Sequence, residues 1–536
     1  MYLTFAVISL TLTLAAVNAR PNNLTRTVPM GWMSWQAFRC ETDCATFPSR
    51  CISERLYKEM ASALVSGEYL SAGYDTIHLD DCIVAKQRDA SNRLTADEQR
   101  FPSGFQALGD TLHGMGVKFG FYTAISKTTC GGYPGTAPGL ETIDAQTFSE
   151  WGVDYLKADG CGDPDYYATG YPALGSALQA TGRDIVYSCS WPAYLGADET
   201  TKPFSSFIAA GCNLWRNYID MGPTAGYAQG IIEHFGNYSQ YLSLWASPGH
   251  FHDGDMLLAG VEGVPESVAR SQFAIYCILA LPLIMGNDLR VVSESARALL
   301  LNKDAIAISQ DSAGRAGIRL GGPSASLAPQ QVYFRPLANG DVAVALYNAG
   351  PPPSHPWHSD CAPFNETQGG YFAPSGPQPS GWCVTAFGQS LMNWYCCNTE
   401  DCAGYSKWHP SPTHKHTRSR ARPPNINPHT LDIHTADFST ATGAGCMFKN
   451  VDGGFVPGDS SVQGFTKPGF SPPSGSPADI TFAFADVGLY VGQMGKIKVF
   501  DVFSSRVLAV TNATSFTIPS IAWMDTALLR LSVVSP

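Results

Sequence analysis

The stretch VDYLKADGC, residues 153–161, decides the fold, because it begins as an apolar strand and ends in charged side chains. Other apolar runs between Val28 and Ile318 also end in Asp, Tyr, Ser, Trp or Arg. They include residues 74–82, 117–125, 184–191, 213–220 and 281–288. Segments with apolar residues at helical spacing lie between these runs, as in residues 52–66.

This alternation of strand and helix, repeated about eight times over roughly 290 residues, predicts a closed (β/α)8 TIM barrel at residues 20–318. The carboxyl ends of all strands in such a barrel surround one mouth, so polar side chains from distant parts of the sequence converge there. Periodicity alone also allows a doubly wound open sheet, which stays open as an alternative.

A second pattern begins at about Arg319, where short strands alternate apolar and polar residues, as in 331–337 and 341–348. It predicts an antiparallel β-sandwich domain at residues 319–536. A Pro/Gly/Cys-rich insertion at about 351–478 interrupts this domain and is expected to be held by disulfides of its own. Its Cys and His spacing is not typical of a zinc site, and we expect neither a metal nor a cofactor.

The first 19 residues form an apolar stretch that is too short to span a bilayer comfortably and ends in small residues. They predict a cleaved signal peptide at 1–19, with an uncleaved anchor as the alternative because no Lys or Arg precedes the apolar stretch. The 15 cysteines favour an oxidising compartment, with Cys277 as a buried free thiol. Sequons at Asn23, Asn237, Asn365 and Asn512 predict N-glycosylation. We therefore expect the secretory pathway, with a lysosome, a vacuole or the extracellular space as the destination.

The charge pattern narrows the class of partner. Only 15% of the residues are charged, and the net charge is -11. This argues against nucleic acid as a partner and favours a neutral ligand. No segment after the signal has the length and apolarity of a membrane span, so no stable membrane association is expected. A homodimer is compatible with the chain, but the sequence does not decide the oligomeric state.

Two aspartates are candidates for acid and nucleophile chemistry. Asp159 ends its strand two residues after Lys157, and a neighbouring cation keeps a carboxylate ionised as a nucleophile must be. Asp220 ends the run at 213–220 and could protonate a leaving group. If the two face each other, one can attack the anomeric carbon of a sugar while the other protonates the leaving oxygen. The structural alternatives are an ion pair for Asp159 and a helix cap for Asp220.

Further residues suit a sugar ligand. Asp80 and Asp81 end the run at 74–82, and carboxylates of this kind accept hydrogen bonds from the vicinal hydroxyls of a hexose. Trp35 offers an apolar face to the C–H surface of a sugar, although a single tryptophan is more often part of a core. Adjacent residues of a strand point to opposite faces, so both carboxylates reach one pocket only if the strand end bends.

The motifs MGWMSW, LDDC, LKADGC, SCSWPAY, WRNYID and DGDML occur in the order and near the spacing of glycoside hydrolase family 27. The chain resembles these α-galactosidases and α-N-acetylgalactosaminidases from about residue 28 to residue 320, without the Cys-rich insertion. The resemblance implies a (β/α)8 barrel followed by an antiparallel β domain. It also implies hydrolysis with retention, for which the two carboxyl groups lie roughly 5–5.5 Å apart.

Carried over by position, the resemblance implies Asp159 as the nucleophile and Asp220 as the acid/base. The implied sugar pocket consists of Trp35, Asp80, Asp81, Tyr122, Lys157, Arg216 and Asp255. The implied disulfides are Cys40–Cys82, Cys44–Cys51, Cys130–Cys161 and Cys189–Cys212. The chain departs from the family at PGHFHDGDML, where Phe251 replaces a tryptophan, and we expect a changed rim of the pocket.

Selectivity within the family depends on two positions after the fifth strand. Galactose-specific members have Glu and Leu there, whereas this chain has Ser190 and Ala193, as α-N-acetylgalactosaminidases do. The small side chains leave room for a 2-acetamido group, with the Ser190 hydroxyl toward its carbonyl and the Ala193 methyl toward its methyl. We expect hydrolysis of terminal α-linked N-acetylgalactosamine with some α-galactoside activity. An α-galactosidase is the alternative, and a catalytically inactive glycan-binding protein is the alternative of another class, which the presence of both aspartates disfavours.

Overall fold

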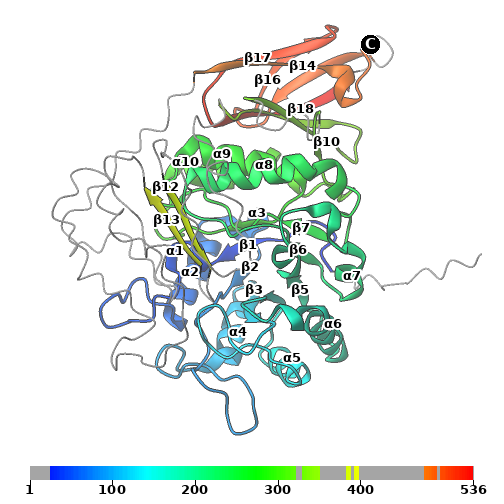
Figure 1. Cartoon of the computed structure of the whole chain (residues 1–536). Coiled ribbons are helices and arrows are strands. Elements are labelled where there is room, and N and C mark those ends of the chain that lie inside the picture. Colours follow the sequence, from blue (N-terminus) through cyan, green and yellow to red (C-terminus); the bar gives the residue numbers. More distant parts are fainter. Residues whose placement is uncertain are drawn as a thin grey trace, which may run out of the picture.

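A computed structural model describes residues 24–321, 329–350, 382–387, 391–396, 476–491 and 495–534 (Figure 1). The predicted signal peptide, the sequons at Asn23 and Asn365 and most of the predicted insertion lie outside these residues. No helix of the described residues is long and apolar enough to cross a membrane.

Eight parallel strands form the predicted barrel in the order β7-β6-β5-β4-β3-β2-β1-β8. They are β1 (Met30–Met33), β2 (Thr76–His78), β3 (Lys118–Ala124), β4 (Tyr155–Asp159), β5 (Val186–Cys189), β6 (Leu214–Arg216), β7 (Phe251–Asp253) and β8 (Leu283–Met285). The seam lies between β7 and β8, where Leu257 bridges Met285 and its N–H donates to the carbonyl of Ile284 at 2.7 Å. The barrel is confirmed, and the doubly wound alternative is excluded.

The barrel interior explains two glycines in its strands. The ring of His78 in β2 is buried between the neighbouring strands β1 and β3. A Cβ atom at Gly31 would lie 2.8 Å from its Nε2 atom, and one at Gly120 would lie 2.5 Å from its Nδ1 atom. Only glycine leaves space for the imidazole there, and Tyr155 packs edge-on against its other side at 4.4 Å between ring centroids.

Helices and short 3₁₀ turns connect the strands. They are α1 (Trp35–Phe38), α2 (Glu54–Ser66), α3 (Tyr69–Ala72), α4 (Gly104–Gly114), α5 (Glu141–Glu150), α6 (Pro164–Ala180), η1 (Trp191–Leu195), η2 (Glu199–Thr201), α7 (Phe204–Ala209), α8 (Ala225–Leu242), α9 (Glu266–Leu279), α10 (Glu294–Leu300) and α11 (Lys303–Ser309). In α2 the Ser53 side chain caps the helix by accepting from the Leu56 N–H. Leu56, Met60 and Leu64 recur at helical spacing and are buried, so one face of α2 covers the barrel.

A six-stranded antiparallel sheet follows the barrel in the order β16-β15-β18-β11-β10-β9. Its strands are β9 (Ile318–Arg319), β10 (Gln330–Pro336), β11 (Val342–Asn348), β15 (Lys496–Asp501), β16 (Arg506–Thr511) and β18 (Asp525–Val534). The pair β14 (Ala478–Ala483) and β17 (Ser515–Ile521), with η7 (Phe484–Val487), forms a second layer, and β12 (Trp382–Phe387) pairs with β13 (Leu391–Cys396). The predicted antiparallel β domain is therefore present.

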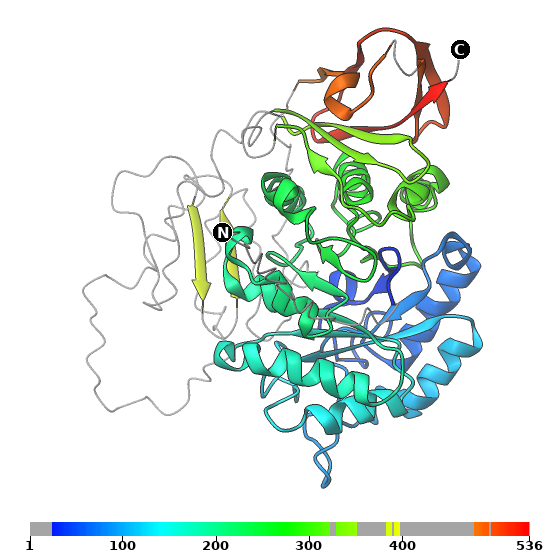
Figure 2. The same cartoon turned by 90° about the vertical axis from the view of Figure 1, so that its right-hand side faces the viewer.

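The layers stack from the barrel through α8 and α9 to the six-stranded sheet and then to β14 and β17 (Figures 1 and 2). Every residue of β11 is buried, because this strand has helices on one side and the second layer on the other. Polar contacts also join the barrel helices to the sheet. Arg270 of α9 pairs with Asp525 of β18 at 2.7 Å. The buried Arg335 of β10 donates from Nη1 to the carbonyls of Cys277 and Ile308, both at 2.8 Å, near the C-terminal ends of α9 and α11.

Candidate active site

The carboxyl ends of the barrel strands carry the predicted site residues. Asp80 and Asp81 follow β2, Tyr122 lies in β3, Lys157 and Asp159 lie in β4, Ser190 follows β5, Arg216 ends β6, and Asp220 and Asp255 follow β6 and β7. Trp35 follows β1, is half-buried and packs against the buried Met33, Met256 and Ile284. The mouth of the barrel thus receives a residue of the predicted set from each of the first seven strands or the loops that follow them.

Lys157 is the central cation of this mouth. Its Nζ atom lies 2.8 Å from Asp80 Oδ2 and 3.7 Å from Asp159 Oδ2. It also lies 5.2 Å from the centre of the Tyr122 ring. Burial lowers the pKa of Lys157, but the carboxylates of Asp159, Asp80 and Asp255 outweigh this and raise it well above its ordinary value. Lys157 therefore stays charged and holds two carboxylates in place.

Asp80 and Asp81 are adjacent but bind different partners. Asp80 binds Lys157 through Oδ2 and accepts from the Asp81 N–H through Oδ1 at 2.8 Å. Asp81 accepts from the N–H groups of Cys82 and Gly131, both at 2.6 Å. Burial raises the pKa of Asp81 to about 6, against hydrogen bonds that lower it. Asp80 thus joins the cluster around Lys157, while Asp81 ties the loop after β2 to the loop after β3.

Asp159 lies between Lys157, Ser190 and a disulfide. The Ser190 hydroxyl donates to Asp159 Oδ1 at 2.5 Å. One carboxylate oxygen and the sulfurs of Cys130 and Cys161 lie within 4.8 Å of one another. Such a group resembles a metal site, but the two sulfurs are bonded to each other and do not act as thiolate ligands. The arrangement instead leaves a fixed carboxylate that is 17% exposed.

Asp220 lies at a more exposed position, next to Arg216. The Arg216 guanidinium pairs with Asp220 and, through Nη1, with Asp255 Oδ1 at 3.2 Å. The Asp220 side chain is 65% exposed, whereas that of Arg216 is 6% exposed. Burial lowers the pKa of Arg216, but Asp255 and Asp220 raise it above its ordinary value. Asp255 has a left-handed backbone with φ of 71°, and its Oδ2 accepts from the Met221 N–H at 2.7 Å.

Asp159 ends β4 and Asp220 follows β6, so both lie at the carboxyl-end mouth of the barrel, where they act on two common neighbours. Partial burial raises the pKa of Tyr194, which is 40% exposed, and the carboxylates of Asp159 and Asp220 raise it further. Both carboxylates also contribute to the raised pKa of Arg216. Tyr194 packs on the backbone directly after Asp159, since a Cβ atom at Gly160 would lie 2.6 Å from the Tyr194 ring. The sequence analysis did not predict Tyr194 as a residue of the mouth. Its position in the motif SCSWPAY, next to the two predicted selectivity positions, was the available sign of it.

Arg39 is a second residue of the mouth that the sequence analysis did not predict. Its guanidinium lies 5.4 Å from the centre of the Trp35 ring and donates to the Gln36 side chain at 3.0 Å. Burial lowers the pKa of Arg39, while Asp220, Asp255 and Asp80 raise it. Its backbone is left-handed, with φ of 49°. A sequence gives little sign of such a residue beyond its position before Cys40.

Ser190 and Ala193 lie at the two ends of one turn. Ser190 is the residue before η1, and its carbonyl accepts from the Ala193 N–H at 3.0 Å. Residues three apart in a 3₁₀ turn lie on the same side, so the hydroxyl and the methyl belong to one surface. The two positions predicted to set selectivity are therefore together, and Ser190 is in contact with Asp159.

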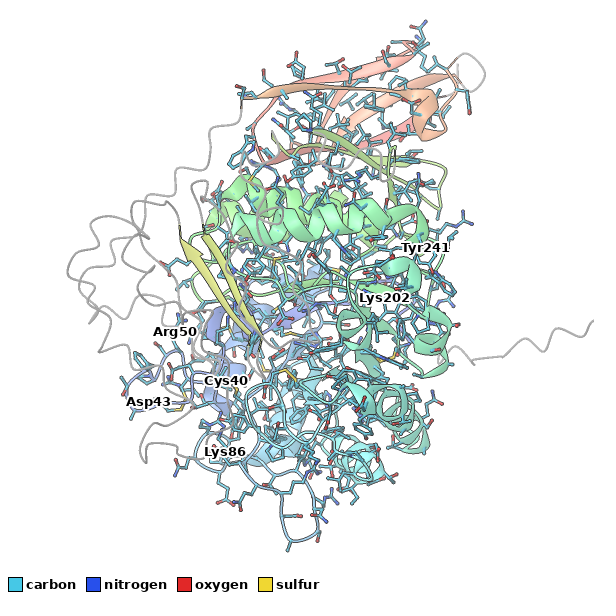
Figure 3. All side chains as sticks on the ribbon, in the orientation of Figure 1. Cys40, Asp43, Arg50, Lys86, Lys202 and Tyr241 are labelled. Carbon is cyan, nitrogen blue, oxygen red and sulfur yellow. A yellow bond between two sulfur atoms is a disulfide. The ribbon has the colours of Figure 1, made fainter. Side chains whose placement is uncertain are left out.

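Disulfides join the loops of this mouth. The bonded pairs are Cys40–Cys82, Cys44–Cys51, Cys130–Cys161 and Cys189–Cys212, which are the pairs implied by the family resemblance. Figure 3 labels Cys40. Cys277 is a buried free thiol, and burial raises its pKa to about 12. The cross-links restrict the loops that carry Asp81, Asp159 and Ser190.

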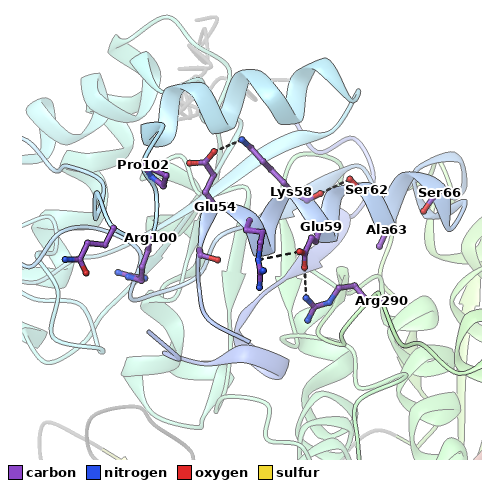
Figure 4. A pocket seen from close by; sticks show the side chains of 12 residues that line it. Glu54, Lys58, Glu59, Ser62, Ala63, Ser66, Arg100, Pro102 and Arg290 are labelled. Atoms are coloured by element: carbon purple, nitrogen blue, oxygen red, sulfur yellow. Dashed lines mark hydrogen bonds and ion pairs between the residues drawn. The ribbon is translucent and has the colours of Figure 1, made fainter. Parts of the chain in front are cut away.

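A separate cavity of about 790 Å³ runs along α2 and contains none of these residues (Figure 4). Its charged groups pair with one another, with Glu54 to Lys58 and Glu59 to Arg290. Active sites of (β/α)8 barrels lie at the carboxyl ends of the strands, and none of the predicted site residues there lines this cavity. We therefore assign the chemistry to the barrel mouth.

Comparison with known proteins agrees with this geometry. The Melibiase_2 family model, described as Alpha galactosidase A, matches residues 27–311. Alpha-N-acetylgalactosaminidase of Gallus gallus is 43% identical over 330 residues, which cover 61% of this chain and 80% of the relative. Alpha-galactosidase A of Homo sapiens is 42% identical over 332 residues, covering 62% of this chain and 76% of the relative. The structure of alpha-galactosidase I from Mortierella vinacea aligns with 96% of this chain and over 100% of its own length, with a TM-score of 0.61. At 22% sequence identity, this similarity supports the fold.

The protein is a glycoside hydrolase: these similarities agree with a (β/α)8 barrel that carries aspartates and a largely buried lysine at its mouth. The chain belongs to the Melibiase_2 family, which is glycoside hydrolase family 27.

Proposed function

We propose that this enzyme is a retaining exo-glycosidase that removes terminal α-linked N-acetylgalactosamine from glycoconjugates and also has some α-galactoside activity. The observation that carries this proposal is the turn from Ser190 to Ala193 beside Asp159, because its small side chains leave space next to the nucleophile. The similarity to Alpha-N-acetylgalactosaminidase of Gallus gallus supports the same substrate.

The proposed reaction has two displacements. Asp159 attacks the anomeric carbon, while protonated Asp220 gives its proton to the leaving oxygen and releases the aglycone. Asp220, now a carboxylate, takes a proton from water, which attacks the glycosyl ester and frees Asp159. Each displacement inverts the anomeric carbon, so the configuration is retained. The reaction requires no metal ion or cofactor, because the two carboxyl groups supply all the proton and nucleophile chemistry.

The remaining residues are proposed to bind the sugar. Asp80 and Lys157 form a largely buried pair that can exchange hydrogen bonds with adjacent hydroxyls of the ring. Arg216 and Asp255 form the pair on the side of Asp220. Trp35 and Tyr122 supply apolar ring surface for the C–H groups of the sugar. Asp81 acts mainly through the loops that it joins, since both of its oxygens already accept backbone hydrogen bonds.

Initial rates on nitrophenyl α-N-acetylgalactosaminide and nitrophenyl α-galactoside test the substrate. We expect the higher kcat/KM on the first, with measurable turnover of the second. A strong preference for the galactoside would reject the proposed substrate, and binding of either sugar without hydrolysis would reject the catalytic reading.

An α-galactosidase is the second candidate, and one contact favours it. The Ser190 hydroxyl already donates to Asp159, so it is not free to donate to an acetamido carbonyl unless it rotates. The identity of 42% to Alpha-galactosidase A of Homo sapiens also supports this candidate. The two rates above decide between the candidates, because only the acetamido sugar gains from such a rotation.

The proposed location is the secretory pathway, ending in a lysosome, a vacuole or the extracellular space. The disulfides support an oxidising compartment. The glycoside hydrolase class implies glycans as the partners, and terminal α-N-acetylgalactosamine or α-galactose is the proposed recognition unit.

A further inference from the structure

A buried polar cluster behind the mouth takes no part in the reaction described above. It consists of Glu199 in η2, Lys202 directly after it, Asn217 directly after β6, and His234 in α8. Glu199 and Asn217 have no exposed surface, and Lys202 and His234 are 3% and 7% exposed. Figure 3 labels Lys202. Burying charged groups costs free energy unless each charge is paired, so the partners of each group show how the cluster is stabilised.

Glu199 is the centre of the cluster. Its Oε1 atom accepts from Lys202 Nζ at 2.8 Å and lies 2.7 Å from Nε2 of His234. Its Oε2 atom accepts from the Asn217 side-chain amide at 2.9 Å. Burial alone raises the pKa of Glu199, but the hydrogen bond from His234 and the charge of Lys202 outweigh it and keep the pKa below its ordinary value. The carboxylate is therefore ionised and fully bonded.

The partners of Glu199 hold the short segment that carries Asp220. Lys202 Nζ also donates to the Asn217 backbone carbonyl at 2.6 Å, so Asn217 is fixed through both its backbone and its side chain. The Tyr218 ring stacks on His234 at 3.8 Å between ring centroids, with 2° between the planes. Asp255 fixes the other end of the segment through the Met221 N–H. Asp220 lies between these two anchors, with 65% of its side chain exposed.

We propose that Glu199 is a positioning residue for Asp220, which it acts on through Asn217 and His234. The same residue joins two loops of the mouth, since η2 continues the loop that begins at Ser190. Because Asp220 is too exposed to be held by packing, its direction depends on its ion pair with Arg216 and on how firmly residues 217 and 218 are anchored. The inference rests on the proposed function, in which Asp220 is the acid of the first step.

Leaving groups that differ in their need for a proton test this role. Methyl α-N-acetylgalactosaminide needs an acid to release methanol, whereas the corresponding glycosyl fluoride releases fluoride with little help from an acid. In Glu199→Gln the side chain keeps its shape, but an NH₂ group replaces one of the two carboxylate oxygens. The side chain therefore cannot accept hydrogen bonds from both Asn217 and Lys202. We expect kcat/KM on the methyl glycoside to fall by about 100-fold, and on the fluoride by less than about threefold.

A matched control separates positioning from general loss of structure. Asp144 in α5 is a buried carboxylate that pairs with Arg88 at 2.6 Å. Asp144→Asn removes a buried charge of the same kind, and we expect it to change kcat/KM on the two substrates by the same factor. An equal fall on both substrates in Glu199→Gln, or no fall on either, would overturn the inference.

A second variant decides the matter if Glu199→Gln does not fold. His234→Gln leaves the pair of Glu199 and Lys202 intact but removes the ring on which Tyr218 stacks. We expect a selective loss of about tenfold on the methyl glycoside, and an unselective loss would again overturn the inference. Hydrolysis of neither substrate by the unmodified enzyme would instead reject the proposed function, so the two failures are distinct.

Discussion

The Ser190 hydroxyl donates a hydrogen bond of 2.5 Å to Oδ1 of Asp159. This contact places a residue that is proposed to select the sugar directly on the proposed nucleophile. A hydroxyl has one proton to donate, so Ser190 can serve either Asp159 or an acetamido carbonyl at a given time. When the Ser190 hydroxyl turns to the 2-substituent of the sugar, the Asp159 carboxylate therefore loses this hydrogen bond.

The variant Ser190→Ala tests this link. It keeps the space for an acetamido group but removes the donor, so we expect kcat/KM on nitrophenyl α-N-acetylgalactosaminide to fall by about tenfold, as for one lost hydrogen bond. With the α-galactoside the hydroxyl stays on Asp159, so its loss changes only the hydrogen bonding of the nucleophile, and we expect kcat/KM to change by less than about threefold. Steady-state rates on both glycosides measure this, and equal losses would contradict the selective role of Ser190.

The double variant Ser190→Glu, Ala193→Leu tests the space rather than the donor. Both side chains enlarge one side of the same turn, so the acetamido group should no longer fit. We expect the preference to move toward nitrophenyl α-galactoside. Unchanged preference in the double variant would show that selectivity is set elsewhere in the mouth.

The proposed nucleophile is tested by Asp159→Asn, which keeps the shape of the side chain but removes the attacking charge. We expect kcat to fall by about 10⁴-fold or more on either nitrophenyl glycoside. Asp163→Asn is a suitable control, because Asp163 precedes α6 and its side chain makes no cap hydrogen bond. Near-normal turnover in Asp159→Asn would remove Asp159 from the mechanism.

Stability should depend on pH through Asp81. Its pKa is about 6 in the folded chain against 3.8 for the free side chain, so between these values the folded state binds the proton more tightly. The stabilisation is complete below pH 3.8 and is lost as the pH rises through 6. One pKa unit corresponds to 1.36 kcal/mol, which gives about 3 kcal/mol in all.

Asp81→Asn removes this titration. We therefore expect the difference in Tm, variant minus unmodified enzyme, to become more positive as the pH rises from 4 to 7. Thermal denaturation across that range measures it. A difference that stays constant would show that Asp81 does not titrate there.

Two described sequons should differ in glycosylation. Asn512 is exposed between β16 and β17. Asn237 lies half-buried in α8, and its side-chain oxygen accepts from Arg319 at 2.5 Å. A glycan is attached to the side-chain nitrogen, and the half-buried Asn237, whose side chain is held against Arg319, leaves less room for it than the exposed Asn512. We therefore expect a glycan at Asn512 and little or none at Asn237. Mass spectrometry of peptides after enzymatic deglycosylation measures both, and full occupancy at Asn237 would contradict the expectation.

Much of the fold could be predicted because polar groups recur at the ends of apolar runs, as Asp159 and Arg216 do. That pattern reflects a local rule of the barrel, in which each strand delivers its last residues to the mouth. The family resemblance supplied roles for these positions and implied the bonded cysteine pairs. Arg39 and the closure of the barrel through Leu257 depend on the tertiary fold, and no local pattern marks them.

Glu199 shows most clearly what a sequence conceals. The surrounding residues GADETTK read as an exposed polar turn, because charged and hydroxyl side chains usually face water. Glu199 is instead completely buried, since Lys202 of the same stretch is joined by Asn217 and His234 from two other places in the chain. Only the assembled fold brings these partners together.

The buried Arg335 has a consequence for how the molecule unfolds. Its guanidinium reaches from the β domain to main-chain carbonyls of Cys277 and Ile308, so separating the two domains would strand the dipoles of two helix ends without their cation. Melting of either domain breaks this contact, so the stability of each domain is coupled to that of the other. The barrel and the β domain should consequently behave as one cooperative unit, with a single calorimetric transition in place of two.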